Sequence, residues 1–358
     1  MKPIKTRIKV QAPARICFFG DHQDYLGLPV IAGTINRYIQ INAIPNSDSQ
    51  FFIQLLDLDK EVIINLNENF NSILNEDYFR SCMAVLKKEG AEFSQGYTVE
   101  ISGDVPVNAG VSSSSALVVA WIRFLLQAQE ANWNSTDKQI GGWAYKAEVL
   151  YFEQPGGLMD QFTIAHGGLI FIDTQSGETT NLTPKLGTLI LAESGIPKQT
   201  LSVLQNARNY AQNAIEEVQS KHPEFNLKKA QEQDFKNHLS LVSKPFQPYW
   251  YAAIHNHLIT QTAKQELSTA EPNFNKIGTL MNTHQRILQD CIQNTPALMI
   301  NQMEAALTAG ASGVKIIGSG GGGCMVALTN ESTKERVIKA FKDAGAADAY
   351  EVQLVSNK

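Results

Sequence analysis

Four consecutive serines constrain this chain more than any other stretch. They follow Gly110 and lead straight into residues 117–126, which are apolar nearly all round and therefore predict a buried helix. The serines then lie in or beside the first helical turn, where backbone N–H groups lack partners and the helix dipole is positive. Small residues there let a phosphate approach the backbone, and hydroxyls bind phosphate or Mg²⁺. We interpret the stretch as a nucleotide-phosphate loop made of Gly110, Val111, Ser112, Ser113, Ser114, Ser115 and Ala116.

Two simpler explanations compete with a phosphate loop. A Ser-rich linker is one, but a linker is polar on both sides, whereas this run lies between a Val-Pro-Val stretch and an apolar helix. A helix cap is the other, but a cap requires one serine and four are present. Because short motifs arise by chance, both alternatives stay open on this stretch alone.

Composition excludes several classes of protein. The 358 residues are enough for about two domains, and 43% hydrophobic with 18% charged residues is typical of a globular protein. The net charge of −5 argues against a nucleic acid or an anionic membrane as the main partner. Arg123 interrupts the longest apolar run, no apolar signal core follows Met1, and the four cysteines form no Cys-x-x-Cys pair. We therefore expect a cytoplasmic protein with reduced thiols.

The order of elements predicts an α+β protein in two parts. The first part has strand-like segments at 10–19, 38–44, 51–58, 61–66, 97–102, 168–173 and 187–193, with helices at 78–88 and 136–152. The second part has helices at 198–219, 245–267, 273–292, 297–309 and 333–344, and strands within 313–328 and at 350–355. We place the domain boundary near residue 190, so that the domains span 1–190 and 191–358.

Two acidic stretches are candidate sites. Asp21-His-Gln-Asp-Tyr25 packs two carboxylates, an imidazole and a phenol between apolar segments, and its acids could bind hydroxyl groups. A solvated turn explains the same residues equally well. Further along, a Pro-Gly-Gly turn precedes Asp160 and places one carboxylate at the start of a new element. The histidines show no metal spacing, and His284 is more readily explained as structural.

The glycine-rich run at 318–323 fits the pattern G-x-G-x-x-G, but an apolar strand follows it where a dinucleotide-binding fold needs a helix. A hairpin turn is the simpler explanation, although five glycines in six residues suggest close approach to another loop or to a ligand. The chain has no Gly-Lys pair of a P-loop, no protein-kinase catalytic loop and no G-x-S-x-G nucleophile elbow.

Three motifs together resemble the GHMP kinases, the superfamily of galactokinase, homoserine kinase and mevalonate kinase. They are residues 12–25 (APARICFFGDHQDY), 105–116 (VPVNAGVSSSSA) and 315–328 (KIIGSGGGGCMVAL), and they span almost the whole chain. Within the superfamily, Gly157-Leu-Met-Asp-Gln161 and Ala147-Glu148 are similar to the galactokinase branch. The resemblance implies an N-terminal domain like ribosomal protein S5 domain 2, a ferredoxin-like C-terminal domain, and a substrate cleft between them.

The resemblance also implies roles for single residues. Asp160 would be the catalytic carboxylate and Arg15 its neighbouring cation, while Glu148 with Ser113 or Ser114 would bind Mg²⁺ beside ATP. The sugar pocket would comprise Asp21, His22, Asp24 and Tyr25, and Gly320 and Gly321 of the third motif would also contact substrate. The protein would act on a small molecule as a monomer or homodimer.

The chain departs from the galactokinase pattern in several places. Asp21 stands where Glu is usual, Gln23 where Thr is usual, and Leu-Gly-Leu-Pro follows Tyr25 as in mevalonate kinases. Gly322 replaces a frequent aromatic residue. Three hypotheses follow: a sugar 1-kinase, a mevalonate-type kinase, and a non-catalytic regulator that binds sugar and ATP. The serines, Asp160 and Arg15 are all present, which argues against the regulator.

Overall fold

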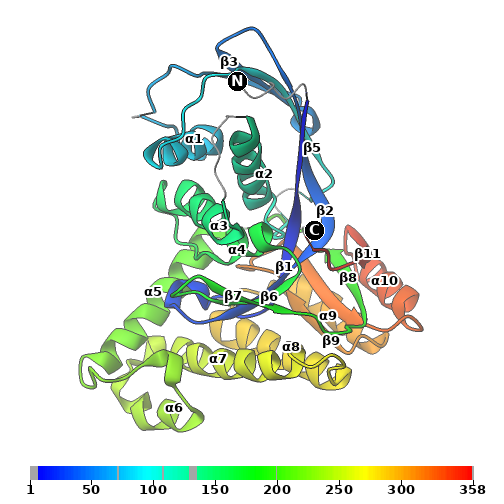
Figure 1. Ribbon diagram of the computed structural model, residues 1–358. Helices are drawn as coiled ribbons and strands as arrows, with labels where there is room; N and C mark the ends of the chain where they lie inside the picture. Colours follow the sequence, from blue (N-terminus) through cyan, green and yellow to red (C-terminus); the bar gives the residue numbers. More distant parts are fainter. Residues whose placement is uncertain (1–6, 71, 107–108, 129–134, 199, 357–358) are drawn as a thin grey trace.

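The computed structural model describes residues 7–70, 72–106, 109–128, 135–198 and 200–356 (Figure 1). The chain forms two sheets with helices packed around them, which confirms the predicted α+β class. The first sheet contains β1 (Ile8–Phe19), β2 (Val30–Pro45), β3 (Gln50–Leu55), β4 (Lys60–Asn65), β5 (Tyr97–Gly103), β6 (Leu169–Asp173) and β7 (Glu178–Leu182). The second contains β8 (Thr188–Glu193), β9 (Gly313–Ile316), β10 (Cys324–Thr329) and β11 (Asp348–Val352).

The first sheet has the order β4-β3-β5-β2-β6-β7, and β1 pairs with β2. Figure 1 shows β1 and β2 as a long blue ribbon pair, with helices α1 to α4 on one side of it. These helices are α1 (Tyr78–Lys88), α2 (Ser113–Ala128), α3 (Asp137–Tyr145) and α4 (Met159–His166). The largest hydrophobic core lies between the sheet and α2, where Trp121 and Phe124 pack against Phe51.

The second sheet is antiparallel, with the order β11-β8-β10-β9. Its helices are α5 (Thr200–Gln219), α6 (Glu232–His238), α7 (Gln247–Leu267), α8 (Phe274–Ile287), α9 (Ala297–Thr308) and α10 (Lys334–Asp343). The glycine-rich run connects β9 to β10, so the predicted hairpin is confirmed. Because Phe19 and Ile35 of the first sheet share one buried cluster with Leu191 and Val326 of the second, the two sheets are packed tightly together.

Several elements differ from the sequence prediction. Strand β2 starts at Val30, eight residues before the predicted start, because its first half pairs with both β1 and β6. Strand β7 and helix α6 were not predicted, since their residues are polar and mostly exposed. The first sheet uses strands before residue 183 and the second uses strands from residue 188 on. The domain boundary at residue 190 stays a prediction.

The described C-terminal residues return to the first sheet. Leu354 forms a β-bridge with Ile35, and Ser356 forms one with Gly167. The backbone N–H of Val355 donates to the carbonyl of Thr34, and the Val355 carbonyl accepts from the N–H of Gly168 and from the Thr34 hydroxyl, the latter at 2.5 Å. Within the described part of the chain, no helix combines the length and apolar character needed to cross a membrane.

Candidate active site

The three sequence motifs meet around one cavity of about 920 Å³. The first motif lines it with Arg15, Asp21, His22 and Asp24, and the serine loop with Gly110 and Ser112 to Ser115. Glu148, Gly157, Asp160, Lys198, Gly318 and Ser319 complete this polar end. An apolar end is lined by residues such as Ile39, Leu55, Tyr78 and Leu117. Residues as far apart in the sequence as Arg15 and Ser319 therefore share one site.

Arg15 and Asp160 form a two-pronged ion pair at the centre of the polar end. Strand β1 supplies Arg15, and the first turn of α4 supplies Asp160. Nε of Arg15 donates to Oδ1 of Asp160 at 2.8 Å, Nη2 donates to Oδ2 at 2.7 Å, and Nη1 donates to the carbonyl of Gly110 at 2.7 Å. Such paired hydrogen bonds between charged groups are strong and fix both side chains.

This pairing keeps Asp160 ionised. Burial alone would raise the pKa of Asp160, but the charge and hydrogen bonds of Arg15 lower it below its ordinary value. The hydroxyl of Ser112 also donates to Oδ2 at 2.5 Å. Asp160 therefore presents a negatively charged carboxylate next to the serine loop, and its catalytic role stays a prediction.

The serine loop has the expected place at a helix start. Helix α2 begins at Ser113, and the backbone N–H of Ala116 donates to the carbonyl of Ser112, whose φ of +62° lies in the left-handed region. Ser112 to Ser115 line the cavity, whereas Val111 and Ala116, also predicted to bind nucleotide, are buried and do not line it. Their side chains support the loop from the core.

Glu148 lies beside the serine loop in a π-helical turn, Lys146–Leu150, which continues α3. π-turns inside helices are frequent at functional sites. Nε2 of Gln161 donates to the Glu148 carboxylate at 2.7 Å. Burial raises the pKa of Glu148, although hydrogen bonds from Gln161, Ser114 and Ser115 oppose the rise. A buried carboxylate beside two hydroxyls is a set of hard oxygen donors, which fits Mg²⁺.

Asp24 is a further carboxylate that lines the cavity. Its Oδ1 accepts the backbone N–H of Tyr25 at 2.9 Å. Burial, together with the negative charge of Asp160, raises the pKa of Asp24 to about 6. Asp160, whose pKa is lowered, and Asp24, whose pKa is about 6, thus line the same cavity. Acids with shifted pKa values are common at sites of proton transfer.

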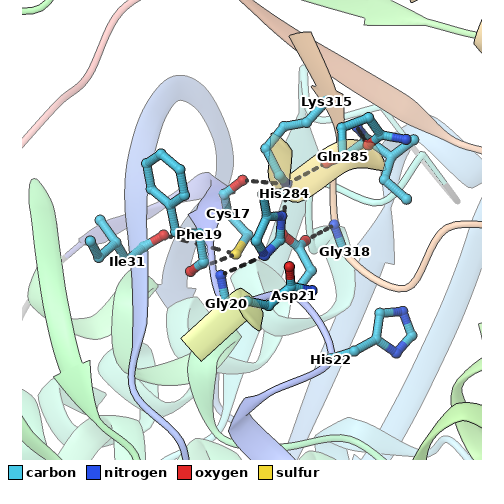
Figure 2. A network of polar contacts seen from close by, with 12 residues as sticks. Cys17, Phe19, Gly20, Asp21, His22, Ile31, His284, Gln285, Lys315 and Gly318 are labelled. Atoms are coloured by element: carbon cyan, nitrogen blue, oxygen red, sulfur yellow. Dashed lines mark hydrogen bonds and ion pairs between the residues drawn. The ribbon is translucent and has the colours of Figure 1, made fainter. Parts of the chain in front are cut away.

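Asp21 was predicted to bind substrate, but its carboxylate is committed to protein partners. Figure 2 shows Asp21 between Lys315 and Gly318. Oδ2 lies 2.6 Å from Nζ of Lys315, and Oδ1 accepts the backbone N–H of Gly318 at 2.9 Å. Burial would raise the pKa of Asp21, but Lys315 and His284 lower it. Asp21 borders the cavity with both of its oxygens already bonded to protein groups, and its predicted contact with substrate stays a prediction.

His22 and Tyr25 contact each other beside the cavity. His22 lines the cavity, and its two ring nitrogens lie 3.0 Å from the Tyr25 hydroxyl and 2.9 Å from the carbonyl of Ser319. Tyr25, predicted to bind sugar, does not line this cavity and instead borders a separate hollow of about 530 Å³ beside Phe225 and Lys228. Tyr25 therefore contacts His22, and its predicted contact with substrate stays a prediction.

Gly320 and Gly321 do not line the cavity, and their predicted contact with substrate stays a prediction. The N–H of Gly321 donates to the carbonyl of Asn294 at 2.6 Å, and a Cβ at position 320 would come within 2.4 Å of the same oxygen. The glycines thus permit a close approach between protein loops. Gly318 and Ser319, one turn earlier, line the cavity instead.

Sequence reasoning missed two lysines. Lys198 lines the cavity. A Cβ placed on Gly318 would lie 3.8 Å from Nζ of Lys198 and 3.6 Å from Nη2 of Arg15. Burial and the nearby charge of Arg15 lower the pKa of Lys198 to about 8. Lys315 is fully buried in β9. A lysine inside the apolar run Gly-Val-Lys-Ile-Ile was a usable signal, whereas Lys198 followed a proline at an expected domain boundary and gave none.

Comparison with known proteins identifies the family. The model of the GHMP kinases N terminal domain matches residues 77–168, and that of the GHMP kinases C terminal domain matches residues 265–347. A mevalonate kinase of Thermococcus gammatolerans is 27% identical over 95% of this chain and 94% of its own length. A galactokinase of Haemophilus influenzae is 28% identical over 94% of this chain and 88% of its own length.

Solved structures share the fold. The crystal structure of Lactococcus lactis galactokinase complexed with galactose matches with a TM-score of 0.87 and 21% identity over 99% of this chain and 95% of that one. The Methanococcus jannaschii mevalonate kinase matches with a TM-score of 0.73 and 18% identity over 98% and 99%. With both family domains, full-length relatives and the two-domain fold in place, the chain belongs to the GHMP kinase family.

Proposed function

We propose that this protein is an ATP-dependent kinase that phosphorylates the anomeric hydroxyl of a monosaccharide. The observation that carries the proposal is the Asp160 carboxylate, held ionised by Arg15 in the cavity that the serine loop lines. The second carboxylate, Asp24, lies on the same wall and offers an acceptor for a further hydroxyl of the substrate. A substrate with several neighbouring hydroxyl groups could donate one hydrogen bond to Asp160 and another to Asp24.

The nucleotide would bind with its phosphates at the start of α2. Free N–H groups of the first turn and the hydroxyls of Ser112 to Ser115 would hold the phosphate oxygens. Glu148 and Ser114 are the residues proposed to hold Mg²⁺, which neutralises phosphate charge when bound. The described residues contain no group of three or more His, Cys, Asp or Glu side chains fit for a metal. Phosphate oxygens and water would therefore supply most ligands.

The chemistry would be an in-line transfer. The acceptor oxygen forms a bond to the γ-phosphorus, the bond from that phosphorus to the bridging oxygen breaks, and the electron pair leaves with ADP. Asp160 orients the acceptor hydroxyl and accepts its proton as the new bond forms. Arg15 and Lys198 face the same space and would stabilise the charge on the transferring group. Because the pKa of Asp160 is lowered, the proton transfer would come late.

A mevalonate-type kinase is the second candidate. Curated mevalonate kinases and galactokinases are about equally similar to this chain. Lys198 is a cation at the polar end of the cavity, so a carboxylate on the acceptor would find an oppositely charged partner there.

We also propose that the protein works on small molecules in the cytoplasm as a monomer or homodimer. Its two domains would meet near residue 190.

The decisive experiment is ADP release by the purified protein with Mg-ATP and a panel of acceptors. The panel contains galactose, glucose, N-acetylhexosamines, fucose, arabinose, glucuronate, a heptose and mevalonate. Phosphorus NMR of any product locates the new phosphate, and phosphate on an anomeric oxygen is the expected result. The Asp160→Asn variant, purified in the same way, serves as the matched control, and its ADP release should be roughly 10²–10⁴-fold slower than that of the wild type.

The other outcomes separate the alternatives. Phosphorylation of mevalonate alone contradicts the sugar proposal and supports the second candidate. ATP binding without turnover on any acceptor contradicts the kinase proposal within this panel and favours a non-catalytic regulator. A sugar phosphorylated at a non-anomeric hydroxyl would keep the kinase activity but overturn the assigned position of transfer.

A further inference from the structure

Asp21 and Lys315 form an ion pair that is hidden from solvent. Both side chains are 0% exposed, and they belong to the first motif and to β9, 294 residues apart. The three protons of the ammonium group are fully used: Nζ donates to Asp21 at 2.6 Å, to the carbonyl of Ile316 at 2.6 Å and to the carbonyl of Cys17 at 3.1 Å (Figure 2). The pair is geometrically complete without any ligand.

Stability alone is a poor explanation for such a pair. Taking two charges out of water costs about as much as their attraction returns, and well-packed apolar residues are often as stable in the same place. Losing one partner, by contrast, leaves a buried charge unpaired and is strongly destabilising. The function of the pair is therefore sought in the groups that it holds in position.

The pair holds the part of the cavity wall that contains Gly318 and Ser319. Oδ1 of Asp21 accepts the N–H of Gly318, and the next residue, His22, contacts the carbonyl of Ser319 through Nε2 at 2.9 Å. Two successive residues of the first motif thus hold two successive residues of the glycine hairpin. Gly318 and Ser319 both line the cavity.

The held segment lies beside the reacting groups. A Cβ placed on Gly318 would lie 3.6 Å from Nη2 of Arg15, 3.8 Å from Nζ of Lys198 and 3.4 Å from the carbonyl of Gly110. Any shift of Gly318 would therefore change the space between both cations and the phosphate loop. Behind the pair, the buried His284 accepts the N–H of Gly20 at 3.3 Å and holds the start of the same motif.

We propose that Asp21 and Lys315 are positioning residues: their ion pair sets the segment that contains Gly318 and Ser319 against the first motif and so aligns the acceptor with Asp160. Asp21 then acts through Lys315 and the hairpin and makes no contact with the substrate. This inference rests on the proposed kinase activity at this cavity, but it does not depend on which acceptor is phosphorylated.

The test compares Asp21→Asn, Lys315→Met and the double variant. Each single change leaves a buried charge or dipole unmatched, so we expect Tm to fall by roughly 5–15 °C. The double variant should recover most of that loss. It should still show kcat/KM for the acceptor about tenfold or more below wild type, since a small misplacement near the chemistry is costly. The Kd of Mg-ADP should stay within about threefold, which separates positioning from general damage.

Two results would overturn the proposal. A double variant with wild-type kcat/KM shows that the pair is only structural. If Asp21→Asn raises the acceptor KM while Lys315→Met leaves it unchanged, Asp21 binds the acceptor directly. The surface ion pair of Lys185 and Glu271, both more than 75% exposed, supplies a matched control double variant, Lys185→Met with Glu271→Gln, which should change neither Tm nor kinetics.

A second measurement needs no acceptor, so it distinguishes failure of this inference from failure of the proposed function. Hydrogen–deuterium exchange of a peptide covering residues 313–324 should become faster in the double variant, because the Gly318 N–H loses its charged partner. Exchange across the control double variant should match wild type. Unchanged exchange at 317–323 in the Asp21/Lys315 double variant would show that the pair does not hold the hairpin.

Discussion

Gly157 lies directly against the carboxylate of Asp24: a Cβ at position 157 would come within 2.2 Å of both Cγ and Oδ2. No side chain fits there unless Asp24 moves. The Pro-Gly-Gly turn that precedes α4 therefore forms part of the wall that fixes the second acid of the cavity.

Replacing Gly157 with Ala should displace Asp24 and lower kcat/KM for the acceptor about 10- to 100-fold. Affinity for Mg-ADP should be unchanged, because the serine loop lies elsewhere in the cavity. Gly156→Ala is the matched control, since a Cβ on Gly156 meets only Val149 at an ordinary 4.0 Å. Equal effects of the two substitutions in steady-state kinetics would contradict the assignment of Asp24 to the acceptor.

Replacing Asp160 with Asn should lower kcat by roughly 10²–10⁴-fold, because the amide cannot accept the proton of the acceptor hydroxyl. Nucleotide binding, measured by calorimetry, should change by no more than a few-fold. The shape of the side chain is nearly conserved, so the fold should survive. Turnover within a few-fold of wild type would remove Asp160 from the catalytic role.

Replacing Lys198 with Met should lower kcat roughly 10- to 100-fold, because a charge-assisted contact to the transferring phosphoryl group is lost. Affinity for Mg-ADP, which lacks that group, should hardly change. Lys185→Met, at an exposed ion pair, is the control. If the change instead raises only the KM of a carboxylate-bearing acceptor, Lys198 recognises the substrate and the mevalonate-type alternative gains support.

The same lysine predicts an alkaline limit on activity. Its pKa is lowered to about 8, so Lys198 loses its charge above that pH, and kcat should fall there. Arg15, Asp160 and Glu148 face Lys198. The pKa of Arg15 is raised and that of Asp160 is lowered, so both stay charged across this range, while burial raises the pKa of the nearby Cys324 thiol far above it. A Lys198→Arg variant, which stays charged, should retain activity to higher pH; an unchanged alkaline limb would assign it to another group.

Asp24 predicts a pH-dependent cost in stability. Its pKa is about 6 in the folded protein, above the ordinary 3.8, so the folded state binds the proton more tightly than the unfolded state. Stability therefore falls as pH rises from about 4 to 6, and the loss persists above pH 6. Asp24→Asn should raise the free energy of unfolding at pH 7.5 by about 1–3 kcal/mol, with the gain vanishing near pH 4.

Asp173→Asn is a control of opposite sign. Burial would raise the pKa of Asp173 slightly, but Lys228 lowers it below its ordinary value. Its pairing therefore stabilises the fold at neutral pH and is lost on acidification. Denaturant melts at pH 4 and 7.5 check both variants, and a gain for Asp24→Asn that is equal at the two pH values would show that the charge of Asp24 is not its cause.

The parts of this protein that sequence predicts are those governed by local pattern. Residues 117–126 specify a buried helix through apolar content alone, and α2 forms there with the serines at its start. The Arg15–Asp160 pair was expected only through resemblance, because its members are 145 residues apart. The partnership of Asp21 with Lys315 was not foreseen, since nothing in the sequence around Asp21 specifies which cation the fold brings to it.

The neighbours of the third-motif glycines could not be predicted from sequence for a related reason. A sequence shows that Gly320 and Gly321 need unusual backbone freedom, but it does not show whether a ligand or another loop occupies the adjacent space. Here Asn294 occupies it. Lys198 and the first half of β2 were not predicted because their roles depend on residues that are distant in the sequence. For Lys198 these are the other residues that line the cavity, and for β2 they are strands β1 and β6.

The return of residues 353–356 to the first sheet means that the two halves of this enzyme cannot be separated as working modules. Thr34, which binds Val355, is also the register partner of Arg15 in β1. A fragment that stops near residue 190 would keep Asp160, Arg15 and the serine loop, yet it would expose the backbone groups that the returning segment satisfies. Residues 353–356, which follow the last strand of the second sheet, thus complete the strand pair that carries Arg15, so the first sheet is not fully paired without them.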